Sequence, residues 1–184
     1  PQWAYKEKSV GRLLPEVELR IRNPDFLGRG EIVVRGPMIM QGYYKNPEAT
    51  GKVLDDEGWF STGDVGRIDR KGYVFLTGRS KNLIVTEGGK NVYPEEIEEK
   101  FELFDELEQV MVKGYVIDKA SKSEGIELLV YVNPDMELVQ ERLEAMVSEV
   151  NRSLLPYQRI SRVTRLAAPL EMTTTKKIKR HLVG

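Results

Sequence analysis

Residues 88–104 read Gly-Gly-Lys-Asn-Val-Tyr-Pro-Glu-Glu-Ile-Glu-Glu-Lys-Phe-Glu-Leu-Phe, and the pattern of the chain changes within this stretch. A helix is predicted to begin at Pro94, because proline is favoured in the first turn and the helix dipole favours the carboxylates that follow it. Ile97, Phe101 and Phe104 recur at helical spacing and give this helix one apolar face. The stretch therefore marks a change from a strand-rich region to one that contains helices.

The chain upstream of residue 88 is rich in strand patterns. Residues 16–22 alternate between polar and apolar side chains, which is typical of a half-buried strand. A second run, residues 31–35, ends at the turn signal Gly36-Pro37. Within residues 66–76, Asp69-Arg70-Lys71-Gly72 connects two short runs as a hairpin. We therefore expect the region up to residue 80 to be mostly β.

The chain downstream of the predicted helix combines further strands with a second helix. Period-two and helical spacings predict a long amphipathic helix at residues 139–154 and strands at residues 110–117, 127–132 and 160–166. The expected fold class is therefore α+β, a β-rich part followed by a small domain with helices on a short sheet. We place the domain boundary after residue 80, which makes the two domains residues 1–80 and 81–184.

Composition excludes several classes of function. The chain has 28 Lys and Arg residues against 29 Asp and Glu residues, and this balance gives little support to nucleic-acid binding. It has no Cys, and His181 is its one histidine, so we expect no metal bound by the protein itself. No apolar run reaches the ~18 to 20 residues of a transmembrane segment, and no signal peptide opens the chain, which favours a cytoplasmic protein.

Five blocks rich in glycine and charge follow one another along the chain. They are residues 42–50 (Gly-Tyr-Tyr-Lys-Asn-Pro-Glu-Ala-Thr), 58–64 (Gly-Trp-Phe-Ser-Thr-Gly-Asp), 78–84 (Gly-Arg-Ser-Lys-Asn-Leu-Ile), 88–98, and 173–180 (Thr-Thr-Thr-Lys-Lys-Ile-Lys-Arg). Taken together and in this order, they resemble the C-terminal part of the adenylate-forming, AMP-binding acyl-CoA synthetase superfamily. Each block alone is a weak signal. The first block and the Ile-Val-Thr-Glu-Gly-Gly-Lys-Asn segment, residues 84–91, look most like long-chain fatty acid–CoA ligases.

Asp64 and Arg79 are the candidate nucleotide-binding residues. A short carboxylate that follows Gly63 in a tight turn can accept two hydrogen bonds from a ribose diol. The alternative is an ordinary turn aspartate that bonds its own backbone, and residue chemistry alone favours this alternative. The resemblance implies that Asp64 holds the 2′ and 3′ hydroxyls of ATP and that Arg79 also reaches the ribose.

Lys81, Gly88 and Gly89 are the candidates for movement and for CoA binding. The resemblance places Lys81 at the hinge about which the small domain turns, where a polar residue absorbs a dihedral change without disturbing either core. Its alternative reading is an ordinary exposed lysine. Paired glycines permit a close ligand approach or only shape a turn. The resemblance places them against the pantetheine tunnel of CoA, with Gly89 as the closer match.

Lys177 is the candidate catalytic residue. A lysine in a flexible terminal segment can enter a site and neutralise charge that develops during attack on the α-phosphate. The alternative is a basic tail on a solvated surface. The family pattern is roughly Pro-x-Thr-x-(Ser/Thr)-Gly-Lys-(Ile/Val)-x-Arg, and this chain has Glu171 at the Pro position and Lys176 at the Gly position. Lys177 and Arg180 match the pattern.

The resemblance implies a two-step reaction. The acid is first activated with Mg²⁺-bound ATP to an acyl-adenylate, and the acyl group is then transferred to CoA, a co-substrate, after the small domain has turned. The phosphate-binding loop and the acyl pocket of the family lie upstream of these blocks. We therefore expect residues 1–80 to be the β-rich remnant of the large N-terminal AMP-binding domain and residues 81–184 to be the mobile domain. Because the chain opens at Pro1 rather than Met, we expect it to be a fragment. Because it lacks the phosphate-binding loop and the acyl pocket, we expect it to be inactive alone.

Three alternative readings stay open at this point. The acid can instead be aryl, short-chain or an amino acid for a carrier protein, because the pocket that would decide lies elsewhere. The chain can also be a non-catalytic interaction module whose lysine-rich tail binds an acidic partner, or a regulatory domain that binds nucleotide phosphates. A long-chain acid as the substrate favours peripheral association of the full-length parent with a membrane.

Overall fold

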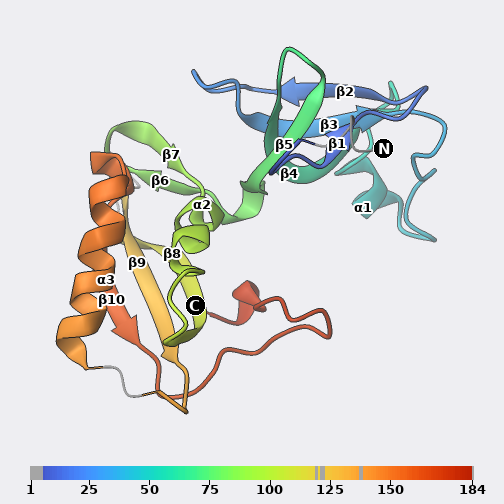
Figure 1. Ribbon diagram of the computed structural model, residues 1–184. Coiled ribbons are helices and arrows are strands. Elements are labelled where there is room, and N and C mark those ends of the chain that lie inside the picture. Colours follow the sequence, from blue (N-terminus) through green and yellow to red (C-terminus); the bar gives the residue numbers. More distant parts are fainter. Residues whose placement is uncertain (1–5, 119, 121–122, 137–138, 184) are drawn as a thin grey trace. The chain divides into compact units, whose positions relative to one another are not determined.

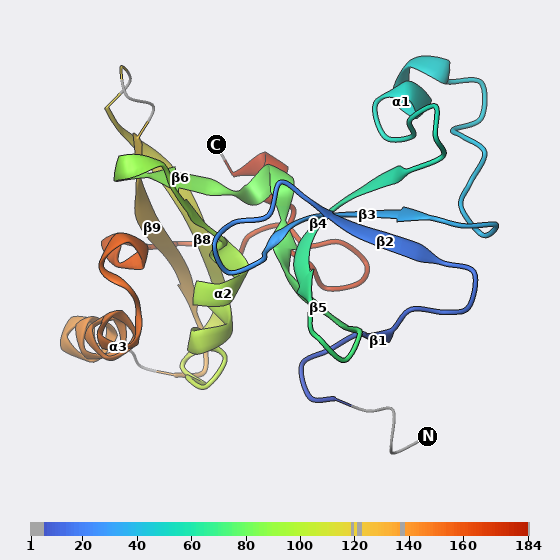
Figure 2. The same cartoon turned by 90° about the horizontal axis from the view of Figure 1, so that it is seen from above.

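The structure is a computed structural model that describes residues 6–118, 120, 123–136 and 139–183. The chain divides into two compact units, Pro1–Lys81 and Asn82–Gly184 (Figures 1 and 2). Within the described residues, no helix is long and apolar enough to cross a membrane.

The first unit contains a five-stranded antiparallel sheet in the order β1-β5-β4-β3-β2. Its elements are β1 (Gly11–Arg12), β2 (Glu18–Arg22), β3 (Gly30–Arg35), α1 (Pro47–Gly51), β4 (Phe60–Ile68) and β5 (Tyr73–Arg79). Trp59 is 3% exposed, and the guanidinium carbons of Arg20 and Arg35 lie 4.0 and 4.7 Å from its ring centroid. The two cations cover the ring through cation–π contacts and help to bury it.

Three tight turns of the first unit are built in the same way. In each, a glycine N–H donates to the carbonyl of an aspartate three residues earlier, and the aspartate Oδ1 accepts the N–H groups two and four residues later. The glycine has a positive φ, which it adopts without the steric cost that a Cβ would bring. We name this arrangement the Asp-x-x-Gly turn; its three copies are Asp25 to Gly28, Asp55 to Gly58 and Asp69 to Gly72.

The second unit contains a mixed sheet with two α-helices. Its elements are β6 (Ile84–Thr86), β7 (Lys90–Val92), α2 (Pro94–Glu98), β8 (Leu107–Asp118), β9 (Ser123–Val132), α3 (Gln140–Ser153) and β10 (Ile160–Arg165). Strand β9 pairs antiparallel with β8 and parallel with β10 and β6, and β7 pairs antiparallel with β6. Helix α3 runs beside β9 and β10 (Figure 1).

One hydrophobic core joins the helices of the second unit to its sheet. Ile97 and Phe101 contribute from α2 and the turn that follows it, Met146 from α3 and Leu128 from β9, and each is 0 or 1% exposed. The apolar face that the sequence predicts at residues 97–104 is therefore the face that packs. The α+β fold class expected from the sequence is confirmed.

The helix predicted to begin at Pro94 is shorter and tighter than its spacing suggests. Helix α2 ends at Glu98, and residues Glu99–Phe101 form a 3₁₀ turn. In the turn that follows, the Phe104 N–H donates to the Phe101 carbonyl at 3.1 Å, and the two ring centroids lie 5.9 Å apart. The α-helical spacing predicted for residues 97–104 therefore does not continue past Glu98.

Helix α1 was not expected from the apolar pattern, because none of its residues is buried. Its start signals are nevertheless present in the sequence. The Asn46 side chain accepts a hydrogen bond from the Ala49 N–H at 3.0 Å, and Pro47 occupies the first turn. Capping, rather than burial, holds this short helix.

We expect Phe101→Ala to lower the free energy of unfolding of the second unit by about 3–5 kcal/mol, because it leaves a cavity in a closed core. Leu103→Ala, two residues away at a side chain that is 85% exposed, is the matched control and should change it by less than about 0.5 kcal/mol. Urea unfolding followed by circular dichroism measures both values. Equal effects of the two substitutions would contradict the assigned core.

Candidate active site

Asp64 and Arg79 lie opposite each other on paired strands. Strands β4 and β5 place them in register, and the Arg79 guanidinium forms an ion pair with the Asp64 carboxylate. Arg79 also donates to the Thr62 carbonyl at 3.3 Å, and the Asp64 N–H donates to Thr62 Oγ1 at 3.0 Å. The Asp64 side chain is 34% exposed and the Arg79 side chain is 48% exposed. The structure therefore brings together the two residues that the sequence singles out for the ribose, at a surface that a ligand can reach.

Lys81 is the last residue of the first unit and lies in the 3₁₀ turn Ser80–Asn82. Its neighbours are each held within their own unit. Ser80 Oγ donates to the Gly63 carbonyl at 3.2 Å, and Asn82 Nδ2 donates to Glu95 Oε1 at 2.6 Å. Lys81 is exposed, and within the described residues no ion pair or side-chain hydrogen bond holds it. A change of its dihedral angles would thus break no ion pair or hydrogen bond of its side chain among the described residues.

Gly88 and Gly89 form the tip of the hairpin between β6 and β7. Their φ values are +75° and +69°, in the region that favours glycine. A Cβ added at either glycine would meet no atom within 4 Å in the described part of the chain. The turn needs glycine for its backbone conformation, and the space beside it is open, so both readings of this pair remain compatible with the geometry.

Lys177 lies on an exposed hairpin near the C-terminal end, which we name the Lys177 hairpin and define as residues 171–179. Met172 and Ile178 form an antiparallel bridge, and the Thr173 N–H donates to the Lys177 carbonyl at 2.8 Å. At its open end, the Lys179 ammonium pairs with the Glu171 carboxylate at 3.0 Å. Glu171 stands where the family has proline, and here its side chain helps to close the hairpin.

The tip of the Lys177 hairpin repeats the Asp-x-x-Gly turn with two changed residues. Thr173 replaces the aspartate, and its Oγ1 accepts the Lys177 N–H at 3.1 Å. Lys176 replaces the glycine, with φ at +57° and its N–H bonded to the Thr173 carbonyl at 3.0 Å. A residue with a Cβ in this conformation costs about 1–2 kcal/mol. Lys176 thus keeps the expected glycine geometry at a cost.

An ion pair that the sequence analysis did not single out holds the end of this hairpin. The Arg180 guanidinium pairs with the Glu98 carboxylate and donates to the Val112 carbonyl at 2.9 Å, while the Val112 N–H donates to Glu98 at 2.5 Å. The two side chains are only 21 and 18% exposed. Burial raises the pKa of Glu98 above its usual range, and the charge of Arg180 offsets part of that rise.

A buried amide holds the other end of the hairpin. Gln109, which is 5% exposed on β8, accepts the Leu170 N–H at 2.6 Å and donates to the Leu170 carbonyl at 3.3 Å. The sequence analysis missed this contact, because Gln109 precedes the strand predicted at residues 110–117 and follows the polar Glu108. Arg180 could have been singled out from the sequence, because it matches the family pattern.

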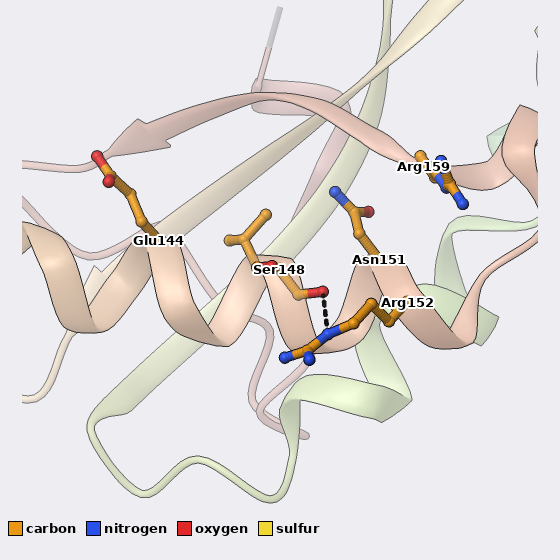
Figure 3. A pocket seen from close by; sticks show the side chains of 6 residues that line it. Glu144, Ser148, Asn151, Arg152 and Arg159 are labelled. Atoms are coloured by element: carbon orange, nitrogen blue, oxygen red, sulfur yellow. Dashed lines mark hydrogen bonds between the residues drawn. The ribbon is translucent and has the colours of Figure 1, made fainter.

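The depression formed by α3 and the turn after it is a separate feature (Figure 3). Its lining includes Ser148, Asn151, Arg152 and Arg159. Asn151 exchanges two hydrogen bonds with the Ile160 backbone, and Arg152 donates to the Ser148 carbonyl at 3.4 Å, so these polar groups serve local structure. None of the residues singled out from the sequence lines this depression.

Apart from Lys81, which ends the first unit, the predicted site residues thus form three groups. Asp64 pairs with Arg79 in the first unit, while Gly88 and Gly89 lie on one loop of the second unit and Lys177 lies on another. Among the described residues, no cluster of three or more His, Cys, Asp or Glu side chains could hold a metal ion.

Comparisons with known proteins place the chain among acyl-activating enzymes. It is 30% identical over 181 residues to the mitochondrial medium-chain acyl-CoA ligase ACSF2 of Macaca fascicularis, covering 95% of this chain and 28% of that protein. It is 32% identical over 151 residues to a long-chain fatty acid–CoA ligase of Bacillus subtilis, covering 82% of this chain and 26% of that protein. No protein-family model matches the chain.

A solved structure shows the same fold. The ATP-bound MatB protein of Rhodopseudomonas palustris superposes with a TM-score of 0.78 and 29% identity, covering 96% of this chain and 35% of that one. The chain spans about a quarter of the length of the curated relatives described above. By sequence and by fold, the chain is a homologue of the adenylate-forming acyl-CoA ligases and matches the C-terminal part of these enzymes.

Proposed function

We propose that this chain works as the C-terminal part of an enzyme that activates a fatty acid with ATP and transfers it to CoA. The first step joins the carboxylate to the α-phosphate, forms an acyl-adenylate and releases pyrophosphate. In the second step the CoA thiol attacks the acyl carbonyl, forms the thioester and releases AMP. The observation that carries the proposal is Lys177, an exposed lysine on a closed hairpin in a chain homologous to acyl-CoA ligases.

Each site residue has one role in this proposal. Asp64 accepts hydrogen bonds from the ribose hydroxyls, and Arg79 holds the carboxylate and contacts the ribose. Lys177 offsets the negative charge that develops at the α-phosphate, a contribution that electrostatic preorganisation makes large. Mg²⁺ enters with ATP as part of the substrate.

The proposed second step uses a different part of the second unit. Lys81 is the hinge about which residues 81–184 turn after adenylation, while residues 1–80 remain part of the large domain. The loop at Gly88 and Gly89 then lies beside the pantetheine arm of CoA. Support for the loop comes from its open space and from its positive φ values, which let the backbone approach a ligand closely.

The length of the acid is the least determined part of the proposal. The relatives described above act, by their names, on medium-chain and on long-chain acids, and the sequence blocks look most like the long-chain enzymes. We therefore propose a long-chain acid. The cytoplasmic setting stays a prediction, because the medium-chain relative is described as mitochondrial.

We expect the full-length enzyme that carries this chain to form acyl-CoA most rapidly from long-chain acids. Mass spectrometry of the thioester product, with short-chain, medium-chain, long-chain and aryl acids in parallel, measures this preference. The chain by itself should form no thioester. A preference for aryl or short acids would replace the long-chain proposal, and the absence of thioester with every acid would reject CoA ligation.

We expect Lys177→Ala to slow acid-dependent exchange of pyrophosphate into ATP by about 10²–10³-fold, since one preorganised electrostatic contact is worth this much. Lys176→Gly is the matched control. It removes the neighbouring charge and relieves the positive φ, so the hairpin and the exchange rate should be retained. If Lys176→Gly abolished exchange and Lys177→Ala retained it, the catalytic role would belong to Lys176 and not to Lys177.

We expect Asp64→Asn to raise the KM for ATP about 10- to 100-fold, because a hydrogen bond to a charged group contributes about 1.5–3 kcal/mol. The exposed Asp56→Asn makes the same charge change in a nearby loop and should leave the KM unaltered. Initial rates at varied ATP concentrations give both values. Equal KM values in Asp64→Asn and the unchanged enzyme would remove Asp64 from the ribose site.

A further inference from the structure

The Lys177 hairpin is fastened to strand β8 at both of its ends. Before it, the Leu170 backbone exchanges two hydrogen bonds with the buried side chain of Gln109. After it, Arg180 bonds to the Val112 carbonyl and to Glu98. Gln109 and Val112 both belong to β8, so two points only three residues apart on one strand hold both ends of the segment that presents Lys177.

The second attachment satisfies backbone groups of β8 with charged side chains. The Val112 N–H donates to the Glu98 carboxylate, and the Val112 carbonyl accepts from Arg180, which pairs with Glu98 in turn. These contacts form a closed set among α2, β8 and the C-terminal segment. Arginine suits this place because its planar fork can donate to a carboxylate and a carbonyl at once, whereas the single ammonium group of lysine has no such fork.

Lys177, the candidate catalytic residue, lies close in sequence to the attachment at Arg180. Arg180 follows Lys177 by three residues, and the bridge between Met172 and Ile178 connects the two arms of the hairpin. A backbone held at both ends and closed in the middle allows Lys177 less freedom than a terminal tail would have. Since a misplacement of about 1 Å can slow a reaction by about 10²-fold, the attachments are expected to matter for catalysis.

We propose that Arg180 and Gln109 are positioning residues, which fix where the Lys177 hairpin presents its lysine during adenylation. This inference rests on the proposed function, because it needs Lys177 to act in the first step. Neither residue is assigned any contact with a substrate.

Hydrogen exchange tests the attachments without any activity. In the chain itself, Arg180→Met and Gln109→Met should speed exchange of the Thr173, Lys176 and Lys179 amides, each of which donates to a backbone carbonyl within the hairpin. Arg152→Met, at an exposed arginine of α3, is the control and should leave them unchanged. Unchanged exchange in both test variants would overturn the attachment. If Arg180→Met leaves Glu98 without its partner and fails to fold, the double variant Glu98→Gln/Arg180→Met replaces it.

Half-reaction kinetics in the full-length enzyme test the positioning role. Arg180→Met and Gln109→Met should each lower kcat for acid-dependent pyrophosphate exchange about 10- to 100-fold, with little change in the KM for ATP. Thioester formation from preformed acyl-adenylate should stay close to that of the unchanged enzyme, and Arg180→Lys should recover part of the loss. In a Lys177→Ala background the same substitutions should slow exchange no further.

Failure of the positioning role and failure of the proposed function give different results. Equal loss of both half-reactions, or full additivity with Lys177→Ala, would show a general structural effect and overturn the positioning role. No acid-dependent exchange in the unchanged enzyme would reject the proposed function and, with it, a role in adenylation. The hydrogen-exchange result would then still decide whether the two attachments hold the hairpin.

Discussion

The arrangement of the second unit depends on the hydrogen bonds that the Val112 backbone forms with Glu98 and Arg180. Among the described strands, β8 pairs with β9 alone, so its other side must satisfy its N–H and C=O groups in another way. Glu98 and Arg180 meet this need and pair with each other. This pair is partly buried, so removal of one partner leaves the other charge without its counterion where water reaches it poorly. The ion pair therefore couples α2, the sheet and the C-terminal segment.

The recurring turn connects local conformation with the proposed chemistry. In the first unit, Asp-x-x-Gly turns combine an aspartate that accepts two N–H groups with a glycine suited to positive φ. The Lys177 hairpin keeps two of the three hydrogen bonds of this turn, from the Lys176 N–H to the Thr173 carbonyl and from the Lys177 N–H to Thr173 Oγ1. Its residue with positive φ is Lys176, which has a Cβ, rather than a glycine. The attachments of the hairpin to β8 hold its two ends in addition to this turn.

Much of the fold followed from the sequence, because it rests on local patterns. The strand alternation, the start of the helix at Pro94 and the amphipathic helix that became α3 are set by neighbours in the chain. The resemblance assigned Asp64 and Arg79 to the same ribose, but only the pairing of β4 with β5 shows that they face each other across two strands. The contacts of Gln109 with Leu170 and of Glu98 with Arg180 join residues 61 and 82 positions apart, and no periodicity reports such contacts. The 3₁₀ turn after α2 was missed because apolar residues at positions 97, 101 and 104 also fit a continuous α-helix.

The central claim is that this chain serves an enzyme which adenylates a carboxylic acid. The most direct measurement is exchange of labelled pyrophosphate into ATP by the full-length enzyme, with and without each acid. The account predicts exchange that requires an acid and is fastest with long-chain fatty acids. Exchange that proceeds equally without any acid, or no exchange with any acid tested, would contradict it.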